Sequence, residues 1–184
     1  GKTPQLFYKK LASKINNWDS TQLILSDERL TNDKLLSNTK MVNDIFDKNN
    51  GPSVIEYNLS GSQSSIEKKL KSIKPNLAIL GLGQDGHTAS LFPGKPEVFI
   101  NNENITIYSK KEGEEFSRIS LTFNYLMKSE RIIFLIDGEK KARVLHECLE
   151  GEYNPLKLPA QYILHNYKNH IHFICDTHAA KYLS

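Results

Sequence analysis

The sequence contains few cysteines and no long hydrophobic run. Cys148 lies in a helical pattern and Cys175 in an apolar strand pattern, so we expect free thiols in a reducing compartment and no disulfide framework. No apolar run approaches the length that crosses a membrane, and no secretory leader is visible. The chain begins with Gly1 and not with methionine, which leaves open a leader removed before this residue. These absences predict a cytoplasmic protein without a membrane partner.

A large excess of charge of one sign is also absent. The chain has 24 Lys and Arg residues and 21 Asp and Glu residues, which gives a formal net charge of +3 at pH 7. The lysines are scattered, and no basic run interleaves with aromatic residues, so nucleic acid is not an expected partner. A mildly positive balance suits a small anionic substrate. With 184 residues, 39% of them hydrophobic, we expect a single domain over residues 1–184 with a core of its own.

Short apolar segments alternate with polar turns and helical patterns along the chain. The segments cover residues 22–25, 77–80, 131–136 and 171–175. Residues 26–29 follow the first segment as a charged loop, and helical patterns occupy residues 139–149 and the C-terminus through Leu183. Such alternation predicts an α/β fold with a mainly parallel sheet flanked by helices.

The start of the chain predicts a helix whose first residues could hold an anion. Thr3 is a good N-cap and Pro4 a good first helical residue, and an amphipathic pattern follows them. Free backbone N–H groups, the helix dipole, the Thr3 hydroxyl and the Lys2 ammonium would all attract an anion there. Taken alone, however, these residues favour a plain capped helix.

The most informative segment is the glycine-rich loop after the apolar run at residues 77–80. Residues 81–87 read G-L-G-Q-D-G-H, which places an acid and a histidine where open α/β sheets bind ligands. The letters match G-x-G-x-x-G, but Pro93 and Gly94 leave room for little more than one helical turn after the loop. The next strand candidate, at residues 105–108, ends without a carboxylate for a ribose. A nicotinamide or flavin site is therefore disfavoured, and the Asp-Gly-His triplet also disfavours a plain structural turn.

Taken together, these segments resemble the 6-phosphogluconolactonase family over essentially the whole chain. Residues 80–94 are similar to the family signature L-G-x-G-x-D-G-H-T-A-S-L-F-P-G almost letter for letter. Residues 27–29 with Ser37 and Asn38 resemble its D-E-R block and the following S-N. Further matches are the end of the phosphate loop at residues 1–4, R-I-T-L-T at residues 118–122, and G-x-x-K-A at residues 138–142, aligned on Lys141.

Two departures and two alternatives accompany the resemblance. Leu30 and Thr31 replace the aromatic residue and the valine that usually follow D-E-R. The family's first strand precedes Gly1, so we expect a Rossmann-like sheet of the sugar-phosphate isomerase/lactonase type that lacks its N-terminal strand. Glucosamine-6-phosphate deaminase has the same fold but reads D-E-Y and G-H-I-A-F-N-E-P, so Arg29 and residues 88–93 favour the lactonase. A non-catalytic sugar-phosphate-sensing domain is the alternative outside the enzymes.

The resemblance implies hydrolysis of 6-phosphoglucono-δ-lactone to 6-phosphogluconate in the pentose phosphate pathway, with no metal and no organic cofactor. Histidine titrates near neutral pH, so His87 would activate water while Asp85 orients its ring. Arg29 would also take part in catalysis. Arg29 and Arg118 are both candidates to hold the lactone carbonyl or the phosphate, and the sequence does not decide which residue holds which group. The residues expected to bind substrate or phosphate are Lys2, Thr3, Arg118, Lys141, Gly81, Gly83 and Gly86.

Other interpretations of these residues stay open at this point. Asp85 could cap a short helix at Thr88, and Lys141, taken alone, would more often be a solvated lysine. His170 and His172 share one strand face, but two-residue spacing alone is poor support for a metal site. The expected partner is a small sugar-phosphate lactone, and the resemblance leaves open a fused or associated glucose-6-phosphate dehydrogenase.

Overall fold

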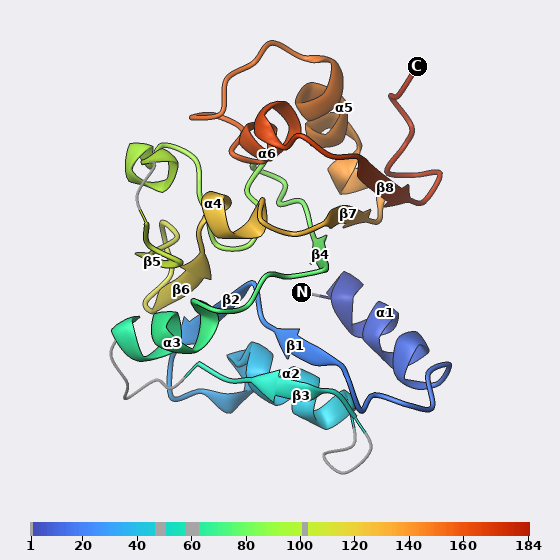
Figure 1. Cartoon of the computed structure of the whole chain (residues 1–184). Helices are drawn as coiled ribbons and strands as arrows, with labels where there is room; N and C mark the ends of the chain where they lie inside the picture. Colours follow the sequence, from blue (N-terminus) through green and yellow to red (C-terminus); the bar gives the residue numbers. More distant parts are fainter. Residues whose placement is uncertain (1, 47–50, 58–62, 101–102) are drawn as a thin grey trace.

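The computed structural model contains two groups of parallel strands (Figure 1). It describes residues 2–46, 51–57, 63–100 and 103–184, without the side chains of residues 2 and 3. β1 (Gln22–Ile24) pairs with β3 (Ser53–Ile55). The second group has the order β4-β7-β8 and consists of β4 (Leu77–Leu80), β7 (Arg131–Ile136) and β8 (Ile171–Cys175). All four apolar segments predicted from the sequence therefore form strands, and the prediction of mainly parallel strands is confirmed.

A three-stranded antiparallel sheet was not predicted. It has the order β2-β6-β5 and consists of β2 (Asp27–Leu30), β6 (Ser117–Leu121) and β5 (Thr106–Ser109). The expectation of a loop at residues 26–29 was therefore wrong, because Asp27 begins a strand that pairs with β6. Three charged residues in a row gave no alternation of apolar and polar residues from which this strand could have been read.

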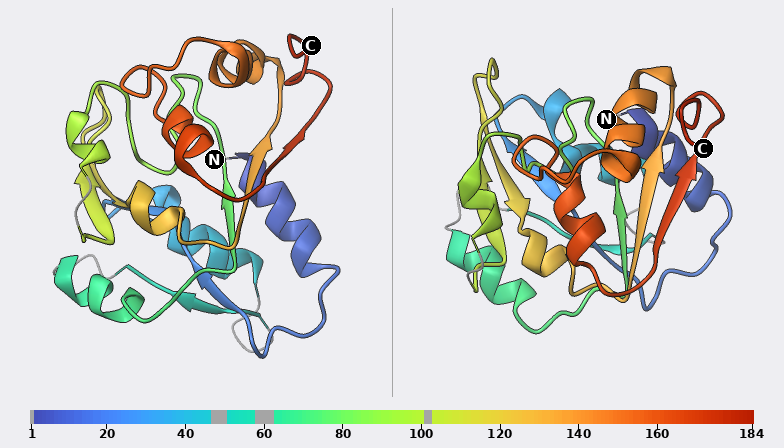
Figure 2. Two further views of the ribbon diagram at one scale, coloured as in Figure 1. Left: turned by 45° about the horizontal axis from the view of Figure 1, so that its top comes forward. Right: turned by 90° about the horizontal axis from the view of Figure 1, so that it is seen from above.

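Helices cover the strands on more than one side. They are α1 (Lys2–Ala12), α2 (Asn38–Ile45), α3 (Gln63–Leu70), α4 (Phe123–Leu126), α5 (Ala142–Glu150) and α6 (Ala160–Asn166), with the short turns η1 (Lys34–Leu36), η2 (Pro96–Phe99) and η3 (Glu139–Lys141). The group β4-β7-β8 lies between α5 and α6 on one side and α1 on the other (Figures 1 and 2). Among the described residues, no helix has the length and apolar character needed to cross a membrane.

Two predictions about the chain ends differ from the structure. α1 begins at Lys2, so Thr3 lies inside the helix and is not its N-cap. Residues 177–182 form turns and not the predicted helix. The Oδ1 atom of Asp176 accepts hydrogen bonds from the backbone N–H groups of Ala179 (2.7 Å) and Gly138 (3.1 Å). These bonds fix the start of the turn and join it to the segment that follows β7.

β7 runs through the centre of the core. Its residues alternate in burial, and Ile132, Phe134 and Ile136 are the buried set. The Phe134 ring stacks on Phe173 of β8 at a centroid distance of 5.5 Å. In the view from above (Figure 2, right), β4, β7 and β8 point the same way, so their carboxyl ends meet at one edge of the molecule. Ligands of open α/β sheets bind at such an edge.

Candidate active site

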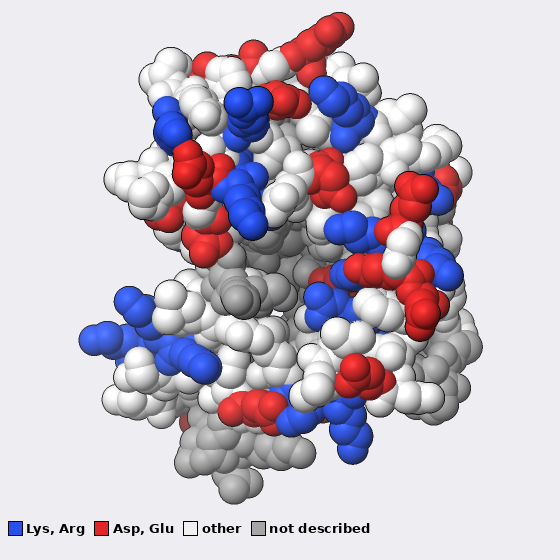
Figure 3. Space-filling view, turned by 180° about the vertical axis from the view of Figure 1, so that it is seen from behind, with Lys and Arg blue, Asp and Glu red and all other residues white. Residues whose placement is uncertain are grey.

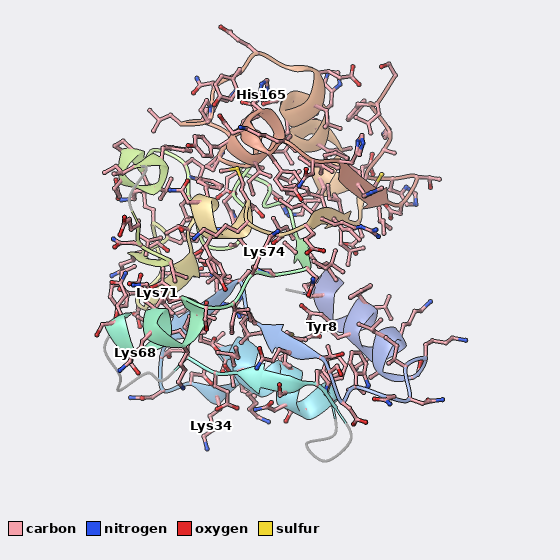
Figure 4. All side chains as sticks on the ribbon, viewed as in Figure 1. Tyr8, Lys34, Lys68, Lys71, Lys74 and His165 are labelled. Atoms are coloured by element: carbon pink, nitrogen blue, oxygen red, sulfur yellow. The ribbon has the colours of Figure 1, made fainter. Side chains whose placement is uncertain are left out.

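A cavity of about 320 Å³ lies at the carboxyl ends of the parallel strands. Its walls come from the residues that follow β1, β4 and β7 and from the first turns of α1, including Pro4, Phe7 and Tyr8. Figure 3 shows the molecule from behind, the side to which these strand ends point, and has a hollow near its centre with Lys, Arg, Asp and Glu side chains around it. Lys71 and Lys74, labelled in the opposite view (Figure 4), come before β4 and so belong to the other end of this strand.

Most of the residues predicted for the site line this cavity. They are Arg29, Gly81, Gly83, His87, Arg118 and Lys141. Asp85 does not line it but contacts His87. Gly86 lies behind the cavity wall, against Leu158. The side chains of Lys2 and Thr3 are outside the described part of the structure, so their proposed contact with phosphate stays a prediction.

Backbone hydrogen bonds close the loop that carries His87. The Gly83 N–H donates to the His87 carbonyl (2.7 Å), and the Gly86 N–H donates to the Gly83 carbonyl (3.1 Å). The hydroxyl of Thr88 donates to the carbonyl of Gly81 (2.9 Å) at the end of β4. No helix begins at Thr88, because residues 84–94 form turns and single bridges. Residues 81–88 therefore form a short loop with internal hydrogen bonds, and this loop holds the imidazole at the cavity.

Asp85 and His87 form a hydrogen-bonded pair. Asp85 Oδ1 contacts His87 Nδ1 and lies 3.4 Å from the backbone nitrogen of His87. Burial alone would raise the pKa of Asp85, but the hydrogen bonds and charge of His87 outweigh it and hold this pKa well below its usual range. With Nδ1 occupied by the carboxylate, Nε2 is the nitrogen left to exchange a proton with a ligand. The alternative of Asp85 as a helix cap is wrong, because Asp85 binds His87 instead.

Two glycines make this arrangement possible. A Cβ atom added to Gly83 would overlap the imidazole of His87 and the carboxylate of Asp85. Gly86 has a φ of +79° and lies so close to Leu158 that an added Cβ would be 2.9 Å from its Cα atom. Gly83 thus gives the His87 ring its space, while Gly86 lets the loop pack against the segment before α6.

Arg29 and Arg118 are direct partners in the antiparallel pairing of β2 and β6, so both lie on the cavity face. Like charges in such a pair repel each other, and an anion in the cavity would relieve the repulsion. Among the described residues, Arg29 Nη1 donates to two neutral oxygens, the Leu36 carbonyl (2.8 Å) and Asn38 Oδ1 (2.6 Å). Its Nε atom is buried without a hydrogen-bond partner among the described residues. Arg118 instead forms a bidentate pair with Glu114, at 2.5 to 2.9 Å.

Lys141 reaches the cavity from η3. Its Nζ atom donates to the carbonyl of Leu82 at 2.5 Å, which fixes the ammonium beside the His87 loop. Burial lowers the pKa of Lys141 below its ordinary value, although the negative charge of Asp85 acts in the opposite direction. Lys141 is therefore a positioned cation of the site and not a freely solvated lysine.

The polar residues of the cavity that were not predicted as site residues include Asp27 and Tyr8. Asp27 accepts a hydrogen bond from the Ser90 hydroxyl (2.7 Å) and lies 3.8 Å from Arg118 Nη1. Tyr8 of α1 faces β1 and β4 (Figure 4), and burial, followed by the charge of Asp27, raises the pKa of its phenol. Asp27 belongs to the D-E-R block, which was the available signal for it, whereas no pattern distinguished Tyr8.

Among the described residues, no group of three or more His, Cys, Asp or Glu side chains is placed to hold a metal ion. His170 and His172, weighed above as a weak metal pattern, gain no third ligand there.

Comparison with known proteins assigns this arrangement to a family. The model of the family described as glucosamine-6-phosphate isomerases/6-phosphogluconolactonase matches residues 1–173. The chain belongs to this family. A 6-phosphogluconolactonase of Helicobacter pylori is 33% identical over 181 residues, covering 91% of this chain and 77% of the relative.

Solved structures of the same family agree with the sequence match. The 6-phosphogluconolactonase of Thermotoga maritima is 30% identical, with a TM-score of 0.78 over 96% of this chain and 82% of that one. The 6-phosphogluconolactonase of Trypanosoma brucei, at 22% identity, has a TM-score of 0.86 over 100% of this chain and 84% of that one, which supports the fold. The predicted Rossmann-like fold of the isomerase/lactonase type is confirmed.

Proposed function

We propose that this chain hydrolyses 6-phosphoglucono-δ-lactone to 6-phosphogluconate, as the lactonases to which it is similar are named for doing. The observation that carries the proposal is the pairing of His87 with Asp85 at the edge of a cavity that also holds three cationic side chains. A base fixed by a carboxylate suits the activation of water, and the cations suit an anionic substrate whose carbonyl gains negative charge during the reaction.

His87 is proposed as the base. With Nδ1 held by Asp85, Nε2 takes a proton from a water molecule as the water oxygen attacks the lactone carbonyl carbon. The C–O π bond breaks toward oxygen and leaves a tetrahedral oxyanion. When this oxyanion collapses, the bond to the ring oxygen breaks, and the imidazolium returns its proton to that oxygen. Asp85 stabilises the imidazolium between the two transfers.

Arg29, Arg118 and Lys141 have different proposed roles in stabilising and binding the substrate. Among the described residues, Arg29 donates hydrogen bonds to neutral oxygens, so its positive charge is available to stabilise the oxyanion. The charge of Arg118 is largely compensated by Glu114 and Asp27, which suits a residue that shapes the site. Lys141, with the Lys2 and Thr3 positions at the start of α1, is proposed to bind the 6-phosphate and so to hold the lactone carbon near His87.

Two alternatives and two wider expectations remain beside this proposal. A deaminase of glucosamine 6-phosphate and a non-catalytic sensor would use the same fold, but Arg29 stands where the deaminase pattern has tyrosine. A sensor would have no need of the His87–Asp85 pair. The cytoplasmic location and the fused or associated glucose-6-phosphate dehydrogenase stay predictions.

The test is turnover of 6-phosphoglucono-δ-lactone generated immediately before the assay, after subtraction of its spontaneous opening. We expect enzymatic hydrolysis, and a loss of about two to four orders of magnitude in kcat/KM for His87→Asn, the usual contribution of a positioned acid–base group. The same preparation is tested for ammonia release from glucosamine 6-phosphate. Ammonia release without lactone hydrolysis would replace the proposal by the deaminase, and binding without either reaction would favour the sensor.

A further inference from the structure

Lys111 brings a cation to the His87 loop from a distant part of the chain. It lies in the hairpin between β5 and β6, which the sequence presents only as a charged surface loop. Its Nζ atom is 4.0 Å from Asp85 Oδ2 and 6.0 Å from the ring centre of Phe92. The Phe92 ring in turn packs against His87, at a centroid distance of 4.9 Å. Lys111 therefore contacts both side chains that surround the proposed base.

The two oxygens of Asp85 have different partners. Oδ1 contacts the imidazole and backbone nitrogens of His87, whereas Oδ2 faces Lys111. A carboxylate that is bound through one oxygen only can rotate about its Cβ–Cγ bond, and a cation at the second oxygen opposes that rotation. Lys111 and Asp85 are about 40% exposed (42% and 38%), so this ion pair contributes little to the stability of the fold. Its effect should be on the orientation of the pair.

We propose that Lys111 is a positioning residue of the hydrolytic reaction, holding Asp85 so that Asp85 keeps the imidazole of His87 aligned with the substrate. The inference rests on the proposed function, in which His87 is the base. The other charged groups around the pair are Lys141, whose ammonium interacts electrostatically with both Asp85 and Lys111, and Arg118, whose guanidinium lies 5.5 Å from the Phe92 ring. Lys111 differs from both because it does not line the cavity.

The test compares Lys111→Ala with Lys110→Ala and Lys111→Arg. Lys110 is the matched control, because it lies in the same hairpin and has no described contact with the His87 loop. For Lys111→Ala we expect kcat to fall about three- to tenfold, with little change in KM. A change of this size lies in the lower part of the range of coupling energies between residues in direct contact. Lys111→Arg should restore most of the rate, and Lys110→Ala should behave as the unchanged protein.

Two further measurements separate positioning from a structural role or from binding of the phosphate. Without the cation of Lys111 the His87–Asp85 pair binds a proton more easily. In Lys111→Ala the midpoint of the pH profile of kcat/KM should therefore move upward by about half a pH unit, and this shift should be smaller in high salt. In an Asp85→Asn background, Lys111→Ala should have almost no further effect.

A loss confined to KM for the phosphorylated lactone, with an unmoved pH profile, would make Lys111 a phosphate ligand and overturn the inference. Normal kinetics of Lys111→Ala, in a protein that hydrolyses the lactone, would also overturn it and leave the proposed function intact. Failure of the unchanged protein to hydrolyse the lactone would instead reject the proposed function.

Discussion

The replacement Gly83→Ala is expected to remove activity by moving the base. The new Cβ atom would overlap the Nδ1 and Cε1 atoms of His87 and Oδ1 of Asp85, so the ring and the carboxylate must shift. Both side chains are partly exposed, at 20% and 38%, so they can move outward and the fold need not open. We expect a displacement of about 1 Å, and a misplacement of that size in a catalytic group costs about 100-fold in rate. The cost in folding free energy should stay at or below about 1–3 kcal/mol.

Gly81→Ala is the matched control for this change. Gly81 lies in the same loop and also lines the cavity, but an added Cβ would have no atom within 4 Å, and its φ is not positive. The measurements are kcat/KM on freshly generated 6-phosphoglucono-δ-lactone and urea unfolding of both variants. Near-normal hydrolysis by Gly83→Ala would show that the position of the His87 ring does not control the rate.

Three further outcomes follow from the site and the core. Lys141→Ala should narrow the preference for the phosphorylated over the unphosphorylated lactone, and an unchanged ratio of kcat/KM values would remove Lys141 from phosphate binding. Because the folded-state pKa of Asp85 is depressed, its contribution to stability is present above the unfolded value of about 3.9 and is lost as pH falls below it. The difference in urea unfolding free energy between pH 6 and pH 3 should therefore be smaller in Asp85→Asn, and an equal difference would contradict the pairing. Burial raises the pKa of Cys148 to about 12, so Ellman's reagent should modify only the half-buried Cys175 quickly in the folded protein and both thiols after unfolding.

The sequence predicted β1, β4, β7 and β8 because each is a short apolar run, which is visible without tertiary information, but it did not predict the parallel strand β3. β2 was not predicted, because its first three residues are charged and its buried residue, Glu28, is one of them. Such a strand depends on partners from elsewhere in the chain, and local propensity does not reveal them. The helix predicted at the C-terminus was also wrong, because residues 177–182 form turns.

The candidate site divides in the same way. His87 and Asp85 are two residues apart, so their contact follows from the tight loop between them and was predicted. Lys111 and Asp27 reach the site only because β5, β6 and β2 form the antiparallel sheet, and without that sheet the hairpin had no predicted neighbour. The His87–Asp85 contact was found from local geometry, and Arg29 and Arg118, which meet through strand pairing, were found from the family resemblance alone.

The D-E-R block shows how one strand supplies both support and chemistry. Side chains alternate across a strand, so Asp27 and Arg29 share the cavity face and Glu28 points to the other. Glu28, only 2% exposed, accepts hydrogen bonds from the backbone N–H groups of Asn38 (2.8 Å) and Thr39 (2.7 Å) at the start of α2. The positive end of that helix stabilises the buried carboxylate.

Glu28 has no capacity left for a substrate, because it also accepts from the hydroxyl of Ser37 (3.1 Å) and from the backbone N–H of Arg29 (2.7 Å). By fixing the start of α2 it fixes Asn38, whose Oδ1 accepts from the Arg29 guanidinium. The middle acid of the block thus has a structural part in the site, since it determines where the Arg29 guanidinium lies at the cavity. We therefore expect the charge of Glu28 to be needed for the role proposed for Arg29 in stabilising the oxyanion.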